Sequence, residues 1–353
     1  MKSPHLLIVC QAYPKQSEPY KLMYAHTRNK EYVKNGVKVT VVSFSATEEY
    51  CYEGITVIPE QSIEDELLNR IDLVAYHAPN LRNHIRFFIL NCRNKKNVFF
   101  IHGHEVLDYT KYYFGRYDNK PFSFLRGVYE KLKLFILRFF ILKFKDKISF
   151  VYVSEWMKEH FYKNIKLNHN HNLNETVINN SVDDVFLNSR WNADTQKLYD
   201  FVTIRPLDEK KYAIDVVITL ANENPKKRFL LYGKGNVFEY INKPNNIEHK
   251  KKFVEPSNIP QILDQAKSVL MPTRLDAQGV MVCEMASYGI PVITSDISIC
   301  KEMLSSFNNV FFINNEKPEL PLITTLGPNT INLMFESNKL SNKEIDFFKE
   351  IIK

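Results

Sequence analysis

Cysteine is scarce in this chain, and the few cysteines present do not form a recognisable set. Cys10, Cys51, Cys92, Cys283 and Cys300 make an odd number, and no two of them have CxxC spacing. This pattern argues against a structural zinc site or a disulfide framework, and it is typical of proteins from a reducing compartment. We therefore expect a cytoplasmic protein that holds no metal.

Long hydrophobic runs and internal repeats are also lacking. No segment approaches the roughly 18 consecutive apolar residues of a membrane-spanning helix. At the N-terminus a single lysine, Lys2, precedes a short apolar run, which predicts a first β-strand rather than a signal peptide. No repeat of 20–50 residues is visible, which argues against a solenoid or propeller.

The charge of the chain is mildly basic, with a formal net charge of +7. The excess of lysine and arginine lies in the first half of the sequence. Such an excess suits an anionic partner, such as a membrane surface or a phosphorylated substrate. It is too weak to indicate nucleic-acid binding, and no nucleic-acid-binding module is recognisable.

Short apolar runs alternate with amphipathic segments twice along the 353 residues. This alternation is typical of doubly wound parallel α/β sheets, and it is interrupted by a polar stretch at 180–199. We therefore predict an α/β protein with two Rossmann-like domains facing a cleft, with ligands beyond the carboxyl ends of the strands. The predicted strands include 6–10, 55–59, 229–232, 249–254 and 310–313; the predicted helices include 19–35, 80–93, 156–163 and 280–288; the predicted domains are 1–185, 186–340 and a C-terminal helix over 341–353.

The segment 272–296 carries the densest set of chemically useful residues. Gly279 stands where a loop becomes a helix, a position at which an anion can approach free backbone N–H groups such as that of Val280. Asp276 lies in the loop, and Glu284 lies on the helix. Two carboxylates placed in this way could hold hydroxyl groups on both sides of a phosphate, although each residue alone is more often a surface acid or a turn glycine.

A second segment, 201–217, reads as a strand followed by a basic loop that opens a helix. Arg205 and Lys210 flank this loop. Arginine offers a planar fork for phosphate and lysine a mobile point charge, so the pair could bind a diphosphate. Without further context, the pair is as easily explained as a solvated turn.

Taken together, these segments resemble glycosyltransferase family 4, which has the two-domain GT-B fold. DAQGVMVCEMASYGIPV (276–292) matches the acidic signature of that family in register, and Asp276 and Glu284 keep the family's seven-residue spacing between acids. Asp276 replaces the usual glutamate, and Ala277–Gln278 replace the usual Gly–Phe pair. FVTIRPLDEKKY (201–212) resembles the basic motif, and the weaker matches LLYGKGN and INNSVDDVF follow the family order over about residues 176–300.

The resemblance implies a retaining glycosyltransferase that moves a sugar from a UDP- or GDP-sugar to a glycan or lipid-linked glycan, in bacterial surface-polysaccharide assembly. Arg205 and Lys210 would hold the diphosphate, Glu284 the ribose and Asp276 the sugar. Other glycosyltransferases use a DxD motif to hold a divalent metal, and this chain has none. No cofactor or metal is therefore expected; the donor-binding set implied by the resemblance is Arg205, Lys210, Val254, Gln278, Gly279, Val280 and Glu284.

A histidine at the end of a strand in the first half is a further candidate. The sequence FFIHGHEV places His102 and His104 there, and many family members have a histidine at this point. His102 is the first choice for a contact with sugar or acceptor, so the catalytic set becomes His102, Asp276, Arg205 and Lys210. A loop histidine that only packs or caps remains the alternative, as does His104 in place of His102.

Residues 122–147 combine lysine and arginine with many aromatic and aliphatic residues. Lys131, Arg138 and Lys145 recur every seven residues and predict a basic stripe along a helix. A basic, aromatic helix can lie in a membrane interface, which would place the protein peripherally on the inner face of the plasma membrane. The alternatives are a helix packed on its own domain or a protein contact.

Two other functions fit the same fold. The substitutions at Asp276, Ala277 and Gln278 leave open a binding or scaffold subunit that has lost turnover. A sugar-nucleotide epimerase or a phosphorylase is also possible on this architecture, although no pyridoxal-binding lysine segment is recognisable. No well-placed nucleophile is recognisable in the sequence, which favours a same-face displacement over a covalent intermediate.

Overall fold

The computed structural model describes residues 3–18, 21–323 and 332–353, so residues 19–20 of the predicted helix 19–35 lie outside the described part. The chain forms two compact units. The sequence predicts domains 1–185 and 186–340 with a separate helix over 341–353, whereas the first unit includes that helix and the second includes a segment from before residue 185. The first unit comprises Met1–Asp108, Tyr129–Ser181 and Ser337–Lys353, and the second comprises Tyr109–Val128 and Val182–Glu336.

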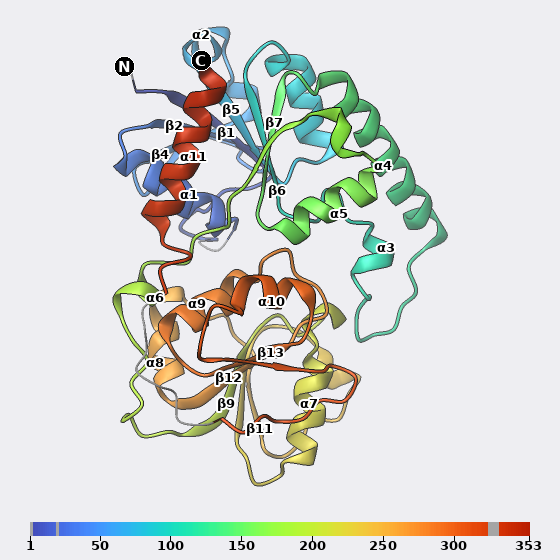
Figure 1. Ribbon diagram of the computed structural model, residues 1–353, viewed down its shortest axis with the longest axis vertical. Helices are drawn as coiled ribbons and strands as arrows, with labels where there is room; N and C mark the ends of the chain where they lie inside the picture. The colour runs from blue at the N-terminus through green and yellow to red at the C-terminus, as the bar shows by residue number, and fades with distance from the viewer. Residues whose placement is uncertain (1–2, 19–20, 324–331) are drawn as a thin grey trace. The chain divides into compact units, whose positions relative to one another are not determined.

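The first unit is built on an eight-stranded sheet in the order β3-β4-β2-β1-β5-β6-β7-β8. β3 pairs antiparallel with β4, and the remaining neighbours pair in parallel. The central strands β1, β5, β6 and β7 are buried along their whole length because helices cover both faces of the sheet (Figure 1). The strands are β1 His5–Cys10, β2 Lys38–Ser43, β3 Tyr50–Tyr52, β4 Ile55–Pro59, β5 Leu73–His77, β6 Asn97–Ile101, β7 Ile148–Tyr152 and β8 Asn174–Val177.

One face of this sheet is covered by α1 and by α11, the last helix of the chain, which lie side by side in Figure 1. Arg28 of α1 forms a buried ion pair with Glu344 of α11, with 2.7 Å between Nε and Oε1. The other face carries an aromatic cluster that joins β5 and β6 to α4. The helices are α1 Met23–Lys34, α2 Asp65–Arg70, α4 Phe124–Phe144, α5 Glu155–Ile165 and α11 Ser337–Ile352, with π-helical turns at Leu81–Ile85 and Phe88–Cys92.

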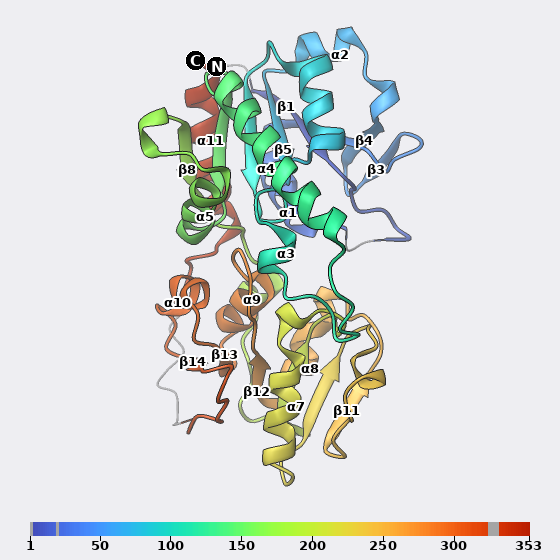
Figure 2. The same ribbon diagram turned by 90° about the vertical axis from the view of Figure 1, so that its right-hand side faces the viewer.

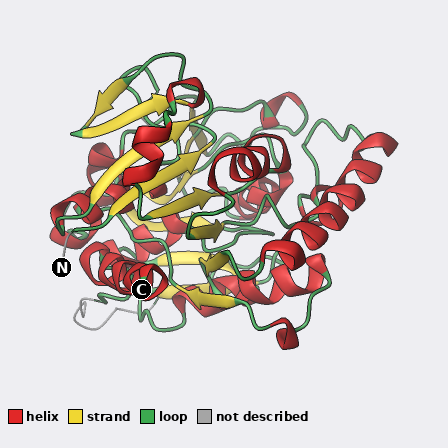
Figure 3. Ribbon diagram, turned by 90° about the horizontal axis from the view of Figure 1, so that it is seen from above, coloured by secondary structure: helices red, strands yellow, loops and turns green. Residues whose placement is uncertain are grey.

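The second unit has a six-stranded, fully parallel sheet in the order β11-β10-β9-β12-β13-β14. Helix α7 lies against this sheet (Figure 2). Its apolar residues share one buried core with those of the strands. In both units the helices surround the strands (Figure 3), which confirms the predicted α/β fold with two parallel sheets. The strands are β9 Tyr199–Ile204, β10 Phe229–Tyr232, β11 Ile247–Lys250, β12 Ala266–Met271, β13 Val292–Ser295 and β14 Val310–Ile313; the helices are α3 Tyr109–Tyr112, α6 Val185–Asn188, α7 Ile214–Glu223, α8 Ile259–Asp264, α9 Val280–Tyr288 and α10 Ser298–Leu304.

Candidate functional site

The strand order of the second sheet reverses between β9 and β12. From β9 the chain continues outward through β10 and β11, and it then returns to place β12 on the other side of β9. In open parallel sheets, ligands bind beyond the carboxyl ends of the strands at such a reversal, because the two following loops diverge there. The predicted basic loop follows β9, and the predicted acidic loop follows β12. The structure therefore brings both motifs to the position where this topology binds ligands.

Arg205 directly follows β9 and is buried, with 7% of its surface exposed. Its Nη2 donates to the carbonyl of Met271 at 3.4 Å, while its Nε has no partner among the described residues. Burial lowers the pKa of the Arg205 guanidinium, and the Asp276 carboxylate partly offsets this effect. A buried arginine with an unused N–H is costly unless an anion completes its hydrogen bonds, so this side chain is suited to a phosphate.

Lys210 lies at the far end of the basic loop and is partly exposed. Its ammonium group donates to the side-chain carbonyl of Asn119 at 2.5 Å. The two predicted cations therefore lie on one loop, with Arg205 buried and Lys210 partly exposed.

The GKG sequence after β10 packs closely on this loop. A side chain at Gly233 would place its Cβ 1.7 Å from the carbonyl oxygen of Arg205, and one at Gly235 would lie 2.8 Å from the carbonyl carbon of Leu207. Both glycines also have positive φ angles, of 156° and 142°. Glycine is required here by close backbone approach, a signal that the sequence alone does not distinguish from an ordinary tight turn.

The acidic loop leads into α9 through Gly279, which adopts a left-handed φ of 75°. Asp276 turns back onto its own loop, where its Oδ1 accepts the N–H groups of Ala277 at 2.8 Å and Gln278 at 3.3 Å. The side chain of Gln278 is buried. The first intrahelical bonds run from Val282 and Cys283 back to Gly279, so the N–H groups of Val280 and Met281 precede the hydrogen-bonded ladder. This helix start is an anion-binding arrangement.

Glu284 lies on α9 and is half-buried. Burial raises the pKa of its carboxyl group to about 8, and the nearby Asp183 carboxylate adds to the rise. The N–H of Asp183 donates to Oε1 of Glu284 at 3.4 Å, and this hydrogen bond partly offsets the rise in the pKa of Glu284. Glu284 therefore carries a proton at neutral pH when no ligand is bound.

This raised pKa predicts a pH-dependent gain in stability for Glu284→Gln. The folded protein keeps the Glu284 proton up to about pH 8, whereas the unfolded chain loses it near the ordinary value of 4.5. Stability therefore falls through this group as the pH rises between those two values. We expect the melting temperature of Glu284→Gln relative to the parent to rise progressively from pH 5 to pH 8 in thermal denaturation. A difference that is constant over this range would contradict the protonated state.

The predicted nucleobase contact lies in a loop. The sequence predicts a strand over 249–254, but β11 ends at Lys250, because the following residues turn toward the 3₁₀ turn Pro256–Asn258 and α8. Val254 is consequently a buried loop residue, and its neighbour Phe253 is 46% exposed. The predicted nucleobase contact therefore falls on a loop with one buried and one partly exposed side chain.

In the first unit, His102 directly follows β6, as the sequence predicts. Its Nε2 lies 3.1 Å from Nδ1 of His77, and its ring lies 4.3 Å from that of Tyr24, centroid to centroid. Burial, with a contribution from Arg28, holds the pKa of His102 well below its usual value, so the imidazole is neutral. His104 is exposed. The geometry distinguishes a packed, neutral His102 from a solvent-facing His104.

Two residues of the second unit were not anticipated from the sequence. Arg274 donates from Nη1 and Nη2 to the two oxygens of Asp215, at 2.8 and 2.7 Å. Arg274 Nη1 also donates to the carbonyl of Lys210 at 2.9 Å, so it ties the acidic loop to the basic loop. Neither residue stands at a fixed place in a motif, and their 59-residue separation gives no local signal.

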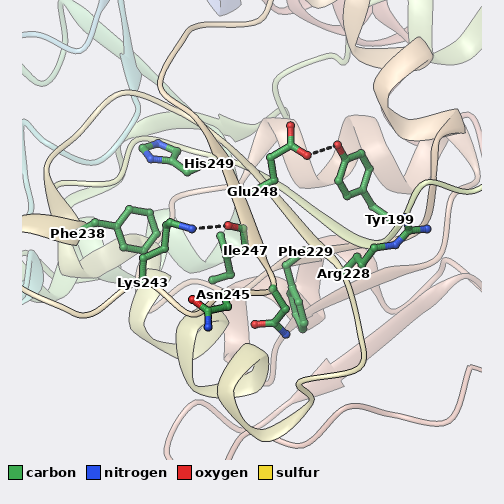
Figure 4. Close-up of a pocket in the computed structure, with 10 residues that line it drawn as sticks. Tyr199, Arg228, Phe229, Phe238, Lys243, Asn245, Ile247, Glu248 and His249 are labelled. Atoms are coloured by element: carbon green, nitrogen blue, oxygen red, sulfur yellow. Dashed lines mark hydrogen bonds between the residues drawn. The ribbon is translucent and has the colours of Figure 1, made fainter.

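A pocket of about 710 Å³ lies elsewhere on the second unit (Figure 4). Tyr199, Phe229 and Ile247, which line it, are the first residues of β9, β10 and β11. It therefore lies at the amino ends of these strands, opposite the end that carries Arg205. A hydrogen bond of 2.5 Å from the Tyr199 hydroxyl to Glu248 already uses part of its polar lining.

Among residues 3–18, 21–323 and 332–353, no group of three or more His, Cys, Asp or Glu side chains is arranged to hold a metal ion. Within the same residues, every helix is too short or too polar to cross a membrane. The longest helix, α4, nevertheless exposes an apolar face. Its members recur at alternating spacings of three and four residues, which places them on one side of the helix; they are Leu125, Val128, Leu132, Phe135 and Phe139.

Comparison with known proteins finds similarity to glycosyltransferases over part of the chain. Residues 202–320 match the family model described as Glycosyl transferases group 1. The O-antigen biosynthesis glycosyltransferase WclY of Escherichia coli is 26% identical over 159 residues, which make up 41% of this chain and 45% of that protein. The match thus spans about half the length of this curated relative.

Solved structures resemble the whole chain in fold. A glycosyltransferase from Rickettsia africae superimposes with a TM-score of 0.68 and 14% identity, covering 100% of both chains. HepE of Anabaena, solved with UDP and glucose, superimposes with a TM-score of 0.61 and 12% identity, covering 98% of this chain and 92% of that one. The chain therefore has the GT-B glycosyltransferase fold, and its residues 202–320 are similar to the glycosyl transferases group 1 family.

Proposed function

We propose that the protein is a glycosyltransferase that moves a sugar from a UDP- or GDP-sugar to a glycan or lipid-linked glycan. The observation that carries this proposal is the meeting of Arg205, the acidic loop and the start of α9 at the carboxyl ends of β9 and β12. The E. coli relative, an O-antigen biosynthesis enzyme, supports a role in bacterial surface-polysaccharide assembly. The Anabaena structure with UDP and glucose supports a nucleotide-sugar donor.

Charge on the leaving diphosphate is the chemical problem that the site would solve. Arg205 and Lys210 supply positive charge, and the N–H groups at the start of α9 supply a favourable dipole. Because these groups are fixed before the bond breaks, they stabilise the developing charge without reorganisation. Catalysis would then proceed without a divalent metal.

The two acidic residues, Glu284 and Asp276, would bind different parts of the donor. Glu284, beyond the phosphate-binding helix start, would bind the ribose hydroxyls, and Asp276 would face the transferred sugar. Because Asp276 holds two loop N–H groups through Oδ1, its Oδ2 is the atom we assign to a sugar hydroxyl. His102, a neutral imidazole, would contact the acceptor or the sugar, and transfer would retain the anomeric configuration by same-face displacement.

Helix α4 would attach the protein to an anionic membrane surface. Its exposed apolar face is accompanied by Lys131 and Lys143, which are exposed. Arg138 and Lys145 of the predicted basic stripe instead donate to the carbonyls of Ile165 and His171, at 3.5 and 3.4 Å. Apolar burial therefore contributes more to this proposed attachment than the predicted stripe does.

A binding subunit without turnover is the second candidate. It is favoured by one observation, the engagement of Asp276 with its own loop in place of the family's longer glutamate. Such a subunit would bind the nucleotide sugar and leave it intact. Asp276→Ala would then bind the nucleotide sugar as the parent does and, like the parent, would not release nucleoside diphosphate.

A transfer assay tests the proposal. The purified protein is incubated with UDP- and GDP-sugars and lipid-linked glycan acceptors, with EDTA present, and release of nucleoside diphosphate is followed. We expect release that requires acceptor, persists in EDTA and is lost in Asp276→Ala. Binding of nucleotide sugar without release in any combination would favour the binding subunit. Activity abolished by EDTA and restored by Mn²⁺ would contradict the metal-free electrostatics.

A further inference from the structure

A short segment of the chain between β6 and α4 belongs to the donor-binding unit. Residues 113–120, here called the strap, lie within Tyr109–Val128, which packs with the second unit although both flanking stretches belong to the first. The strap turns sharply, with positive φ angles at Phe114, Gly115 and Asn119. Such a course needs outside support to be maintained.

That support comes from the basic loop. The N–H of Lys210 donates to the carbonyl of Gly115 at 3.0 Å, and the N–H of Tyr117 donates to the carbonyl of Asp208 at 3.2 Å. Arg116 forms an antiparallel bridge with Glu209 between these two bonds. The strap therefore pairs with the loop as a short strand would, and it fixes the backbone that carries Lys210.

Tyr117 anchors the strap in the core of the second unit. Its ring is 5% exposed, and its hydroxyl donates to Oδ1 of Asp215 at 2.7 Å. The same Asp215 carboxylate receives both hydrogen bonds from Arg274 of the acidic loop. One partly buried network thus joins the strap, the start of α7 and the loop that carries Asp276.

Asn119 is a strap residue whose side chain contacts the ammonium group of Lys210. Its Oδ1 accepts a hydrogen bond from the Lys210 ammonium at 2.5 Å. A carboxamide restricts the position of the ammonium without neutralising its charge, whereas an aspartate would neutralise it. Asn119 has a φ of 54°, a left-handed conformation that asparagine and glycine adopt more readily than other residues.

We propose that Asn119 is a positioning residue for Lys210, which it holds in a restricted but fully charged state for the donor diphosphate. This inference rests on the proposed function, because it assigns the diphosphate to Lys210. Ordering a lysine side chain in advance removes an entropic cost from binding. The strap thereby makes residues from between β6 and α4 part of the donor site.

Three variants test the proposal by calorimetric titration with UDP and GDP. Asn119→Gly removes the carboxamide and tolerates the left-handed backbone, and we expect affinity to fall by about three- to tenfold. Asn119→Asp keeps an acceptor oxygen but neutralises Lys210, and we expect a larger fall of more than about tenfold. Asn245→Asp, an exposed position in the pocket of Figure 4, is the charge-matched control and should bind as the parent does.

The outcomes separate this inference from the proposed function. A parent that binds neither nucleotide overturns both. A parent that binds, with both Asn119 variants equal to it, overturns the positioning role alone. Tighter binding by Asn119→Gly would show that Asn119 holds Lys210 away from the ligand, which also contradicts the proposal. Equal losses in the glycine and aspartate variants would indicate a merely structural effect and overturn it as well.

Discussion

Arg205→Ala is expected to weaken binding of UDP and GDP by about 1.5 to 3 kcal/mol, the contribution of a hydrogen bond to a charged group. The side chain is buried beside the start of the acidic loop, and its Nε has no partner among the described residues. A bound phosphate would satisfy this N–H and compensate the buried charge. Isothermal titration of parent and variant measures the effect directly.

The matched control is Arg228→Ala. Arg228 is an exposed arginine of the same unit, at the amino end of β10 in the pocket of Figure 4. Its removal changes the net charge equally but should leave nucleotide affinity nearly unchanged. Equal losses in the two variants would reduce the effect to general electrostatics, and an unchanged Arg205→Ala would exclude Arg205 from the site.

Replacing Phe135 and Phe139 of α4 with glutamate is expected to release the protein from anionic vesicles. The two rings lie 4.6 Å apart, centroid to centroid, and are 58% and 57% exposed. Burying one phenylalanine side chain is worth about 1.5 to 3 kcal/mol, so the loss of two should weaken binding at least tenfold. Flotation with phosphatidylglycerol vesicles measures the bound fraction.

Exposed apolar residues outside α4 serve as the matched control, because they show whether vesicle binding depends on this face or on exposed apolar residues in general. Val33 and Tyr240 are 45% and 53% exposed and lie outside α4, so Val33→Glu with Tyr240→Glu should float as the parent does. If the α4 variant also floats as the parent does, the membrane proposal fails. If neither the parent nor any variant binds vesicles, the exposed face of α4 serves another contact.

Much of the fold follows from local patterns in the sequence. The ranges of β4, β10, β14 and α9 agree with those predicted, because each is a short, mainly apolar run or a helix bounded by glycines. Residues 80–93 are helical as predicted, but they form π-helical turns, which periodicity does not distinguish from an α-helix. The short strand β3 was not predicted, since three residues give too little alternation.

The division of the chain between the two units is harder to predict from the sequence. Helix α11 ends the chain but packs on α1, where Arg28 and Glu344 pair across 316 residues. The strap joins the second unit through bonds between residues about 90 apart, such as Asn119 and Lys210. No local pattern encodes either contact, because each joins segments that are far apart in the sequence and meet only within a folded unit.

The candidate site shows the same division. Motif spacing predicts Arg205, Gly279 and Glu284 as site residues, and strand order explains why the loops after β9 and β12 lie at the same edge of the sheet. The sequence does not indicate that Asp276 engages its own loop or that burial raises the pKa of Glu284 to about 8. Those properties depend on side-chain direction and on solvent exclusion, which are consequences of the folded state.

Hydrogen–deuterium exchange with and without UDP or GDP tests most directly whether the nucleotide binds at the carboxyl ends of β9 and β12. We predict that the ligand protects amides in 205–212, 233–236 and 276–284, and leaves those around Arg228 and 245–248 unchanged. Protection confined to the latter region would place the nucleotide in the pocket of Figure 4. That result, or no protection by either nucleotide at saturating concentration, would contradict the proposed donor site.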